Sequence, residues 1–385
     1  MSGLKISGRA DIAPFFVMEM MRAAAQREVA GGDVVHMEVG QPSTPAPSGA
    51  RAAAKAAIDG DVLGYTSAVG IEPLRERLAQ HYADWYGHDT DADRIVVTQG
   101  ASGAFTLAFL ACFEAGDRVA VTSPGYPCYR NTLEALDIEV IEIAVTPETG
   151  FRLTADMVEC AGPLDGLVVA SPANPTGTML MADELGRLAR WCHDSSVRLV
   201  SDEIYHGITY GTQAATAAAH SPSAVVVNSF SKYFSMTGWR LGWLLLPPDL
   251  VSPVERLAQN ATIAAATVSQ YAALGAFDSI GELEANVARY TVNRRILLDG
   301  LPSAGIDRIA PPDGAFYIYA NVDHLTDDSA ELAAKWLAEL GIATTPGIDF
   351  DPAEGHRYIR FSFAGSNDDM NQTVERLAGW SDQRR

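Results

Sequence analysis

The sequence predicts an α/β fold whose centre is a mostly parallel sheet of seven strands, with helices on both faces. Two observations lead to this prediction. Short runs of Val, Ile and Leu recur along the middle of the chain, and segments of helix length separate them. Strands that are apolar on both faces are typical of parallel sheets covered on both sides by helices. The seven runs lie at residues 94–98, 118–121, 139–143, 166–170, 197–200, 224–227 and 243–246.

The composition and charge of the chain exclude several classes of function. Its 385 residues carry a formal net charge of −20, which disfavours binding to nucleic acid or to an acidic membrane surface. The N-terminus shows no apolar segment of signal-peptide length, and no apolar run is long enough to span a bilayer. The four cysteines show neither CxxC spacing nor a cluster with histidine, so we expect buried thiols in a reducing compartment. We therefore predict a cytoplasmic protein that binds no metal, no nucleic acid and no membrane.

The residues that follow each strand are the first candidates for a site, because ligands of such sheets bind beyond the carboxyl ends of the strands. Gly100, Ala101 and Ser102 follow the first strand and precede a predicted helix at 104–113. Free backbone N–H groups and the helix dipole make such a helix start suitable for an anion. The segment lacks the G-x-G-x-x-G spacing of a dinucleotide site. We interpret it as a candidate phosphate site, with close helix packing as the alternative.

Asp202 follows another of the apolar strands. Burying a carboxylate there is costly unless a cationic partner meets it. The sequence therefore predicts a cation beside Asp202. Glu203 points to the opposite face if the strand continues, and we expect it to be structural.

The stretch 229–242 lies between the last two strands and is too short to form a helix of its own. It contains Ser229, Ser231, Lys232 and Arg240. Lys232 is one of only four lysines, and the other three lie near the N-terminus or on alanine-rich helices. Burial or a nearby cation such as Arg240 lowers the pKa of a lysine amine, which allows it to act as a nucleophile. A lysine on an exposed loop is the alternative.

With Ser229 before the lysine and Arg240 after it, this stretch resembles the active-site signature of the pyridoxal-phosphate-dependent aminotransferases of classes I and II, the fold type I enzymes of the aspartate aminotransferase type. The resemblance implies that Lys232 binds the aldehyde of pyridoxal 5′-phosphate covalently. It also implies that Ser229 and Arg240 hold the cofactor phosphate, with Ser231 beside them. The segment 100–102 then becomes the third element of the phosphate site.

The same resemblance assigns the remaining cofactor contacts. It implies that Tyr126 stacks on the pyridine ring and that Asp202 pairs with the ring nitrogen. Asn174 and Tyr205 are expected to hydrogen-bond to the phenolic oxygen of the cofactor. We expect Lys232, Asp202 and Tyr205 to be the catalytic residues. A structural role is the alternative for Tyr126.

Three more assignments concern the substrate and the oligomer. A glycine at the position of Gly40 lets the backbone approach the substrate carboxylate in the resembled family, and we place Asn174 in the same substrate site. Arg360 lies on an alternating strand at 358–363 and can present its planar fork to the α-carboxylate of the substrate; a structural salt bridge is the alternative. In the family, a tyrosine at the position of Tyr65 reaches the cofactor phosphate of the neighbouring subunit. We therefore expect a homodimer with shared active sites.

The resemblance also implies a second, smaller α/β domain, and two late strands at 315–319 and 358–363 agree with it. The sequence also predicts a short strand at 34–39 and a long helical region at 251–277. A proline-rich connection after residue 40 marks a boundary. We expect residues 1–45 to be an N-terminal segment that packs with the small domain. Residues 46–280 are expected to form the large, cofactor-binding domain, and residues 281–385 the small C-terminal domain.

The expected reaction moves the amino group of an L-α-amino acid to a 2-oxo acid by a ping-pong mechanism, with Lys232 as the base that moves the Cα proton. A pyridoxal-phosphate-dependent C–S β-lyase of the same fold is the alternative. A transcription regulator with an aminotransferase-like domain would need a basic DNA-binding module, which this acidic sequence does not show. None of the 24 arginines stands out as a second carboxylate-binding residue, so the sequence leaves the amino donor and the acceptor open.

Overall fold

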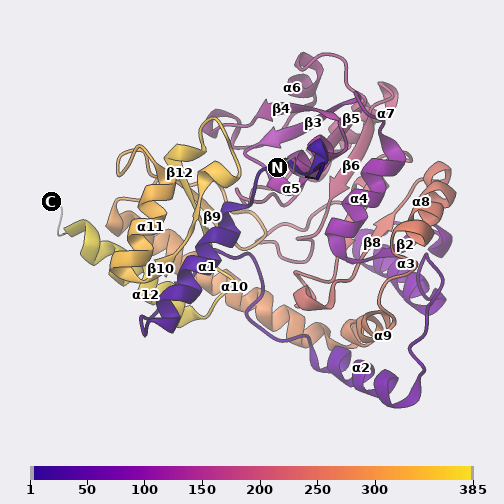
Figure 1. The fold of residues 1–385 in the computed structure, drawn as a ribbon, viewed down its shortest axis with the longest axis horizontal. Helices are drawn as coiled ribbons and strands as arrows, with labels where there is room; N and C mark the ends of the chain where they lie inside the picture. The colour runs from indigo at the N-terminus through magenta and orange to yellow at the C-terminus, as the bar shows by residue number, and fades with distance from the viewer. Residues whose placement is uncertain (1–3, 383–385) are drawn as a thin grey trace.

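The computed structural model describes residues 4–382, and its largest sheet has seven strands in the order β2-β8-β7-β6-β5-β3-β4 (Figure 1). All neighbouring strands are parallel except those that pair with β8, which runs antiparallel to β2 and β7. Each predicted apolar run forms one of these strands, which confirms the mostly parallel sheet. The strands are β2 (Ile95–Thr98), β3 (Arg118–Ser123), β4 (Glu139–Ala144), β5 (Gly166–Ala170), β6 (Arg198–Asp202), β7 (Val225–Ser229) and β8 (Gly242–Leu245).

Helices cover both faces of this sheet, and two separate apolar cores result. Successive side chains of a strand point to opposite faces, so Val168 belongs to one core while Leu167 and Val169 belong to the other. One core is closed by α4 (Gly100–Cys112), α5 (Pro127–Ala135) and α8 (Pro248–Ala261). The other is closed by α3 (Glu72–Tyr86), α6 (Ala155–Cys160) and α7 (Ala182–Asp194).

A second, smaller sheet lies beside the first and has the order β11-β12-β9. It is antiparallel and pairs β12 (Tyr358–Ser362) with β11 (Thr345–Pro346) and β9 (Tyr317–Asn321). Early and late parts of the chain also meet here, because β1 (Val35–His36) pairs with β10 (Ile342–Ala343). The helices around these strands are α1 (Phe16–Val29), α11 (Ser329–Leu340) and α12 (Asn367–Asp382). The domain boundaries expected from the sequence stay predictions.

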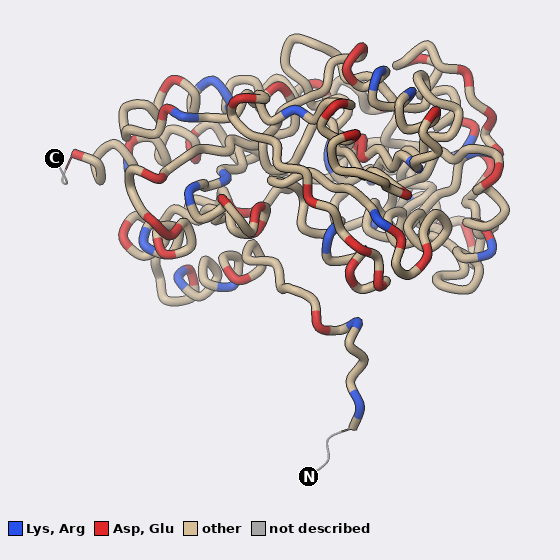
Figure 2. Tube along the Cα trace, turned by 90° about the horizontal axis from the view of Figure 1, so that it is seen from above, with Lys and Arg blue, Asp and Glu red and all other residues tan. Residues whose placement is uncertain are grey.

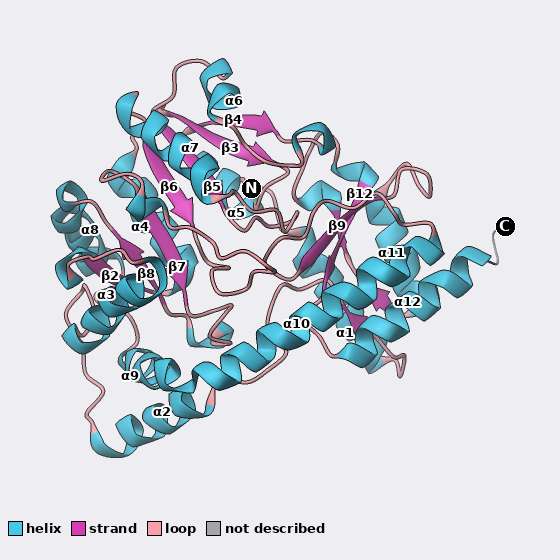
Figure 3. Ribbon diagram, turned by 180° about the vertical axis from the view of Figure 1, so that it is seen from behind, coloured by secondary structure: helices cyan, strands magenta, loops and turns pink. Residues whose placement is uncertain are grey.

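The long helix α10 (Ile280–Gly300) runs from the side of the large sheet to the small sheet (Figure 3). At its start it lies close to α2 (Ser48–Gly60) and α9 (Thr267–Ala276). The helices α2 and α9 approach at two glycines, since a Cβ on Gly49 would overlap the carbonyl oxygen of Gly275. This close approach holds the N-terminal part of the chain against the start of α10.

Two sequence predictions of local structure are corrected here. The helical region predicted for 251–277 is two helices, α8 and α9, because Ile263 adopts a left-handed backbone with φ of 66°. The strand predicted for 34–39 pairs only at Val35 and His36. In both cases the apolar pattern of the sequence extends beyond the helix or strand that forms.

The acidic residues are spread along the chain trace rather than gathered in one part of it (Figure 2). The segment before α1 projects from the body of the molecule in the same view. The prediction of buried thiols is wrong for Cys160, which ends α6 and is exposed, while Cys192 is buried. None of the helices formed by residues 4–382 combines the length and the apolar character that crossing a bilayer requires.

Candidate active site

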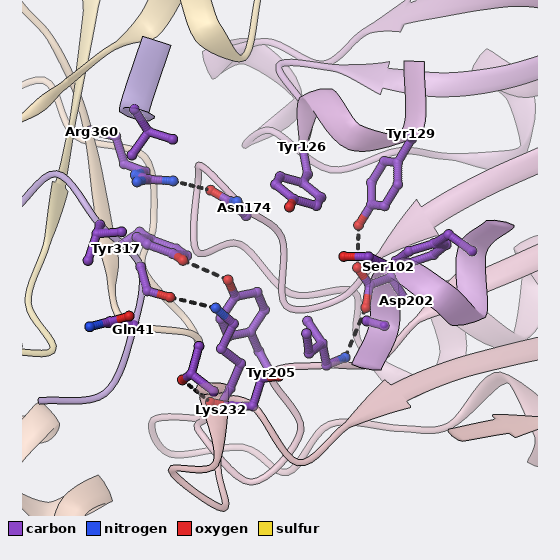
Figure 4. A pocket seen from close by; sticks show the side chains of 18 of the residues that line it. Gln41, Ser102, Tyr126, Tyr129, Asn174, Asp202, Tyr205, Lys232, Tyr317 and Arg360 are labelled. Atoms are coloured by element: carbon purple, nitrogen blue, oxygen red, sulfur yellow. Dashed lines mark hydrogen bonds between the residues drawn. The ribbon is translucent and has the colours of Figure 1, made fainter. Parts of the chain in front are cut away.

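A cavity of about 260 Å³ lies where the carboxyl ends of β6 and β7 face the small sheet (Figure 4). Side chains far apart in the sequence meet in it. The large sheet contributes Asp202, Tyr205, Ser231 and Lys232, the starts of α4 and α5 contribute Ala101, Ser102 and Tyr126, and the small sheet contributes Tyr317 and Arg360.

Lys232 follows β7 and extends into this cavity. Its amine donates a hydrogen bond to the carbonyl oxygen of Gly40 at 2.5 Å. Burial lowers the pKa of Lys232 to about 8, with Arg360 and Arg240 acting in the same direction and Asp202 against them. A useful fraction of the amine is therefore neutral near physiological pH, which a nucleophile or a base requires.

Gly40 is a glycine for a steric reason. A Cβ at this position would overlap the hydroxyl of Tyr317. Its carbonyl accepts from Lys232, so the segment 39–41 forms the wall opposite the large sheet. The expected approach of its backbone to a substrate carboxylate stays a prediction.

Asp202 faces the cavity from the end of β6 and is almost completely buried. Its carboxylate accepts from the hydroxyl of Tyr129 and from the backbone N–H of Ile204 at 3.0 Å. It forms no ion pair with any side chain of residues 4–382. Burial raises the pKa of Asp202 to about 6, although both hydrogen bonds and Lys232 oppose the shift. The sequence predicted a cation beside Asp202, and no side chain of residues 4–382 supplies one in contact with its carboxylate.

Sequence reasoning missed Tyr129. It lies on α5, three residues after Tyr126, and residues three apart share one face of a helix. This spacing was the available signal, because a helix that presents Tyr126 to the cavity also presents Tyr129 to Asp202.

The start of α4 and the loop after β7 form a cationic corner of the cavity. Gly100 begins α4 with a φ of +72°, and a Cβ there would lie 2.6 Å from Nη2 of Arg240. No side chain caps the free N–H groups at this helix start. Backbone N–H groups, the helix dipole and a guanidinium at one point favour an anion such as phosphate. The predicted phosphate residues Ala101, Ser102 and Arg240 line this corner.

Ser229 and Ser231 lie side by side at the end of β7. The hydroxyl of Ser229 donates to the carbonyl oxygen of Leu241 at 2.9 Å and lies 2.8 Å from the hydroxyl of Ser231. Ser231 is among the residues that line the cavity, whereas Ser229 is not. The expected contacts of both serines with a cofactor phosphate stay predictions.

Tyr205 and Tyr317 form a pair of hydroxyls in the cavity, 2.6 Å apart (Figure 4). One hydroxyl donates to the other, so the accepting hydroxyl keeps its own proton for a ligand. Tyr317 was not predicted from the sequence, although it lies on a predicted strand. Its proximity to Tyr205 depends on how the two sheets meet.

Arg360 lies in the middle of β12 with only 3% of its surface exposed. Its guanidinium donates to the side-chain oxygen of Asn174 at 2.9 Å, to the carbonyl of Glu38 at 2.5 Å and to the hydroxyl of Thr345 at 3.1 Å. Its Nε has no hydrogen-bond partner.

No acidic side chain of residues 4–382 pairs with this guanidinium, so the alternative of a structural salt bridge is wrong. A buried cation without a carboxylate is costly. A ligand carboxylate in the cavity would remove that cost.

Asn174 and Tyr126 reach the cavity as predicted, and Figure 4 shows the ring of Tyr126 between Asn174 and Asp202. Because Oδ1 of Asn174 accepts from Arg360, its amide N–H groups are left to donate. Tyr65 is 85% exposed and lies outside the cavity wall of its own chain. Its expected role across a subunit boundary stays a prediction.

Comparison with known proteins decides the family. The sequence model of the family "Aminotransferase class I and II" matches residues 32–377. The chain belongs to this family. It is an aminotransferase, an enzyme that moves an amino group from an amino acid to a 2-oxo acid, and the predicted fold and reaction are confirmed. These comparisons do not favour the alternative of a C–S β-lyase.

Individual relatives cover almost the whole chain. It is 51% identical to the valine–pyruvate aminotransferase of Mycobacterium tuberculosis over 98% of each chain. A crystal structure of an aminotransferase from the same organism matches with a TM-score of 0.97 and 50% identity, over 99% of this chain and all of the other. The aspartate aminotransferase of Thermus thermophilus with maleate matches with a TM-score of 0.93 and 29% identity, over 98% of this chain and all of the other.

Proposed function

We propose that this aminotransferase uses pyridoxal 5′-phosphate held by Lys232, and that it acts by a ping-pong mechanism. The observation that carries the proposal is that Lys232, Asp202 and Arg360 face one cavity and form no ion pair within residues 4–382. The cofactor and an amino acid supply the matching groups: an aldehyde for Lys232, a cationic ring nitrogen for Asp202 and a carboxylate for Arg360. The uncapped start of α4 beside Arg240 suits the phosphate.

When bound, the cofactor supplies an electron sink that stabilises negative charge at the Cα of the amino acid. Asp202 keeps the ring nitrogen protonated, because the carboxylate and the cation neutralise each other in a buried site. Arg360 orients the substrate by its carboxylate. The amine of Lys232 would take the proton from Cα of the substrate and give it to the former aldehyde carbon of the cofactor, since its pKa of about 8 allows both steps near neutral pH. Tyr126 would pack against the cofactor ring, and the Tyr205–Tyr317 pair and Asn174 would donate to its phenolic oxygen.

For the substrates, we propose a small apolar donor such as L-valine and pyruvate as the acceptor. The 51% identical relative is a valine–pyruvate aminotransferase. Among the described residues, three cationic side chains line the cavity, Lys232, Arg240 and Arg360, and each already has a role. Val17 and Val39 line the same cavity, so a second carboxylate on the donor would meet apolar walls.

The test is product formation with the purified enzyme and pyridoxal phosphate. L-valine with pyruvate should yield alanine and the 2-oxo acid of valine in equal amounts, measured by mass spectrometry. L-aspartate with 2-oxoglutarate should react at least about tenfold more slowly, since a carboxylate gains no partner in an apolar pocket. Faster reaction with L-aspartate would overturn the donor assignment. Release of ammonia and pyruvate from a cysteine conjugate without an acceptor would instead favour the lyase.

We further propose a cytoplasmic homodimer in which Tyr65 completes the site of the partner. The loop that carries Tyr65 and the end of α2 before it expose apolar side chains, with Val62 at 97% and Ile58 at 61% exposure. An open cavity of about 710 Å³ lined by Trp239 and Arg240 lies beside the active site. A second copy that covered the apolar loop would remove it from water, and a tyrosine could enter the open cavity next to Arg240.

Mixed dimers test the sharing of sites. A dimer of one Lys232→Ala chain and one Tyr65→Phe chain has one doubly altered site and one intact site if Tyr65 acts across the interface. Refolding the two variants together should therefore restore tight cofactor binding in one of the two sites, although each variant alone binds weakly. No restoration in a mixture that light scattering shows to be dimeric would place Tyr65 in its own subunit's site.

A further inference from the structure

Glu203 is the residue after Asp202, and its side chain lies on the other face of the sheet, outside the active-site cavity. It is completely buried, with 0% of its surface exposed. One oxygen, Oε1, accepts from the N–H of Ala217 at 2.8 Å and from the hydroxyl of Ser201 at 3.1 Å. The other, Oε2, has no hydrogen-bond partner in the described part of the chain and lies 3.5 Å from Nδ1 of His206.

His206 is also buried, and its contacts determine where its ring proton lies. Its Nε2 lies 3.0 Å from the carbonyl oxygen of Ser171. A carbonyl only accepts, so Nε2 carries a proton and donates it. Its Nδ1 lies 2.7 Å from the hydroxyl of Tyr86, which can donate to a bare ring nitrogen. These contacts place a proton on Nε2 and fit a neutral imidazole whose Nδ1 accepts from Tyr86.

The surroundings of Glu203 disfavour its ionised form. The ionisable groups that face the pair are Asp202 beside Glu203, Tyr82 and Tyr86 of α3, and His81 near His206. The charged neighbour of Glu203 is thus another acid, and no arginine or lysine of residues 4–382 forms an ion pair with it. Burial raises the pKa of Glu203 to about 8 and lowers the pKa of His206 to about 4. A proton shared between the two groups therefore lies on Glu203, since an ion pair here would place two charges in an apolar interior.

The pair connects to the substrate site through one turn. His206 holds the carbonyl of Ser171, whose own N–H donates to the carbonyl of Asp202 at 3.1 Å. The hydroxyl of Ser171 accepts from the N–H of Leu180 at 3.0 Å. The turn 171–174 then ends at Asn174, which accepts from Arg360. The position of Asn174 against the guanidinium thus depends on the anchoring of Ser171.

We propose that Glu203, as a neutral acid, and His206, as the Nε2–H tautomer, are positioning residues that hold the turn 171–174 and thereby set Asn174 against Arg360. This proposal rests on the proposed function, because it assigns the substrate carboxylate to Arg360. Neither residue touches the substrate. Loss of the His206 bond would loosen the carboxylate site while leaving Lys232 and Asp202 in place.

Kinetics of two His206 variants test the positioning role. His206→Phe fills the same space and removes the bond to Ser171, so KM for both the amino donor and the oxo acid should rise about tenfold, while kcat changes less than about threefold. His206→Gln retains an N–H donor and should bring KM back to within about threefold of the parent. His193→Phe is the control, because His193 is an exposed histidine that contacts Ser223 on the surface, and its kinetics should match the parent. An unchanged KM in His206→Phe, or a fall in kcat alone, would overturn the positioning role.

The proton position is tested without cofactor or substrate. Glu203→Gln reproduces a neutral acid and removes the group that ionises. Folding raises the pKa of this carboxyl from 4.5 to about 8. The folded protein therefore loses stability as the pH rises from 4.5 to about 8. The thermal midpoint of the cofactor-free variant should therefore exceed that of the parent, and the gain should be larger at pH 8 than at pH 6. A lower midpoint than the parent at both pH values would show that the charged carboxylate is required.

Nitrogen NMR of the cofactor-free protein gives a second measurement, with His206→Gln used to assign the signal. One ring nitrogen of His206 should be protonated from pH 6 to pH 8. Two protonated nitrogens at pH 7 would overturn the proposal. These measurements separate the two proposals: a failure here leaves transamination by the parent enzyme intact, whereas an inactive parent with the expected NMR signal and midpoints would remove only the proposed function.

Discussion

Asp202 and Glu203 are adjacent, both are buried carboxyl groups, and they lie on opposite faces at the end of β6. Burial raises the pKa of both, to about 6 and about 8. Asp202 opens into the cavity that Lys232 and Arg360 share, whereas Glu203 meets only protein groups. Burial of an acid therefore does not identify a catalytic residue. The open space in front of Asp202, which a cation can fill, makes the difference.

The largest effect is expected for Asp202→Asn. An asparagine cannot hold a ring nitrogen protonated, so kcat should fall by about 10²–10³-fold. The same substitution should stabilise the cofactor-free protein. Folding raises the pKa of Asp202 from 3.8 to about 6, so the parent protein loses stability as the pH rises between these two values. The gain should reach about 3 kcal/mol above pH 6, measured by denaturant unfolding at pH 5 and pH 8.

Glu203→Gln is the matched partner of this variant. It should share the gain in stability without the loss of kcat, since its carboxyl faces away from the cavity. A similar fall in kcat for both variants would mean that the two faces of β6 do not differ in function. A loss of stability in Asp202→Asn at pH 8 would contradict the pKa shift.

The next largest effect contrasts two arginines. Arg360 is buried without a carboxylate, whereas Arg357 is half-exposed and pairs with Asp323 and Glu354. Arg360→Met should lower kcat/KM by about 10²-fold, mostly through KM, because a buried charged contact to the substrate is lost. Arg357→Met should stay within about twofold, since exposed pairs contribute little. Equal losses in the two variants would contradict the assignment of Arg360 to the carboxylate.

Tyr129→Phe should give the smallest effect, a small loss of affinity for pyridoxal phosphate and a shift in how that affinity depends on pH. The affinity of the cofactor-free protein for pyridoxal phosphate should weaken as the pH falls through about 6, where Asp202 takes up a proton. The bond from Tyr129 lowers the pKa of Asp202, so its removal should move this midpoint to higher pH. At pH 8 the affinity should fall by about fivefold at most. A midpoint that moves to lower pH in a fluorescence titration would contradict this account.

The sequence was sufficient for the large sheet, because its strands are apolar on both faces and read as continuous runs. The rule that ligands bind beyond strand ends then located Asp202 and Lys232. The alternation of its strand predicted that Arg360 lies on one face, but its assignment to the substrate carboxylate needed the family resemblance. The break at Ile263 was not predictable from the apolar pattern, since that pattern continues through a left-handed residue.

Residues that act through contacts between distant segments were the ones missed. Tyr317 meets Tyr205 across the two sheets, and Tyr129 reaches Asp202 from α5. Glu203 was expected to be only structural, and its link to His206 and Ser171 is visible only in three dimensions. The contact of Ser229 with Ser231 was likewise not expected, and its predicted contact with the phosphate stays a prediction. Apart from the spacing of Tyr129 from Tyr126, these pairings depend on packing that no local pattern encodes.

Reductive trapping tests the central claim most directly, because the chain has only four lysines, Lys5, Lys55, Lys232 and Lys335. The enzyme is incubated with pyridoxal phosphate, reduced with borohydride and digested, and the modified peptide is identified by mass spectrometry. The account predicts one cofactor per chain on Lys232, and loss of that label when L-valine is added before reduction, because the amino donor displaces the lysine. Label on another lysine, or none on Lys232, would contradict the role of Lys232 as the residue that holds the cofactor.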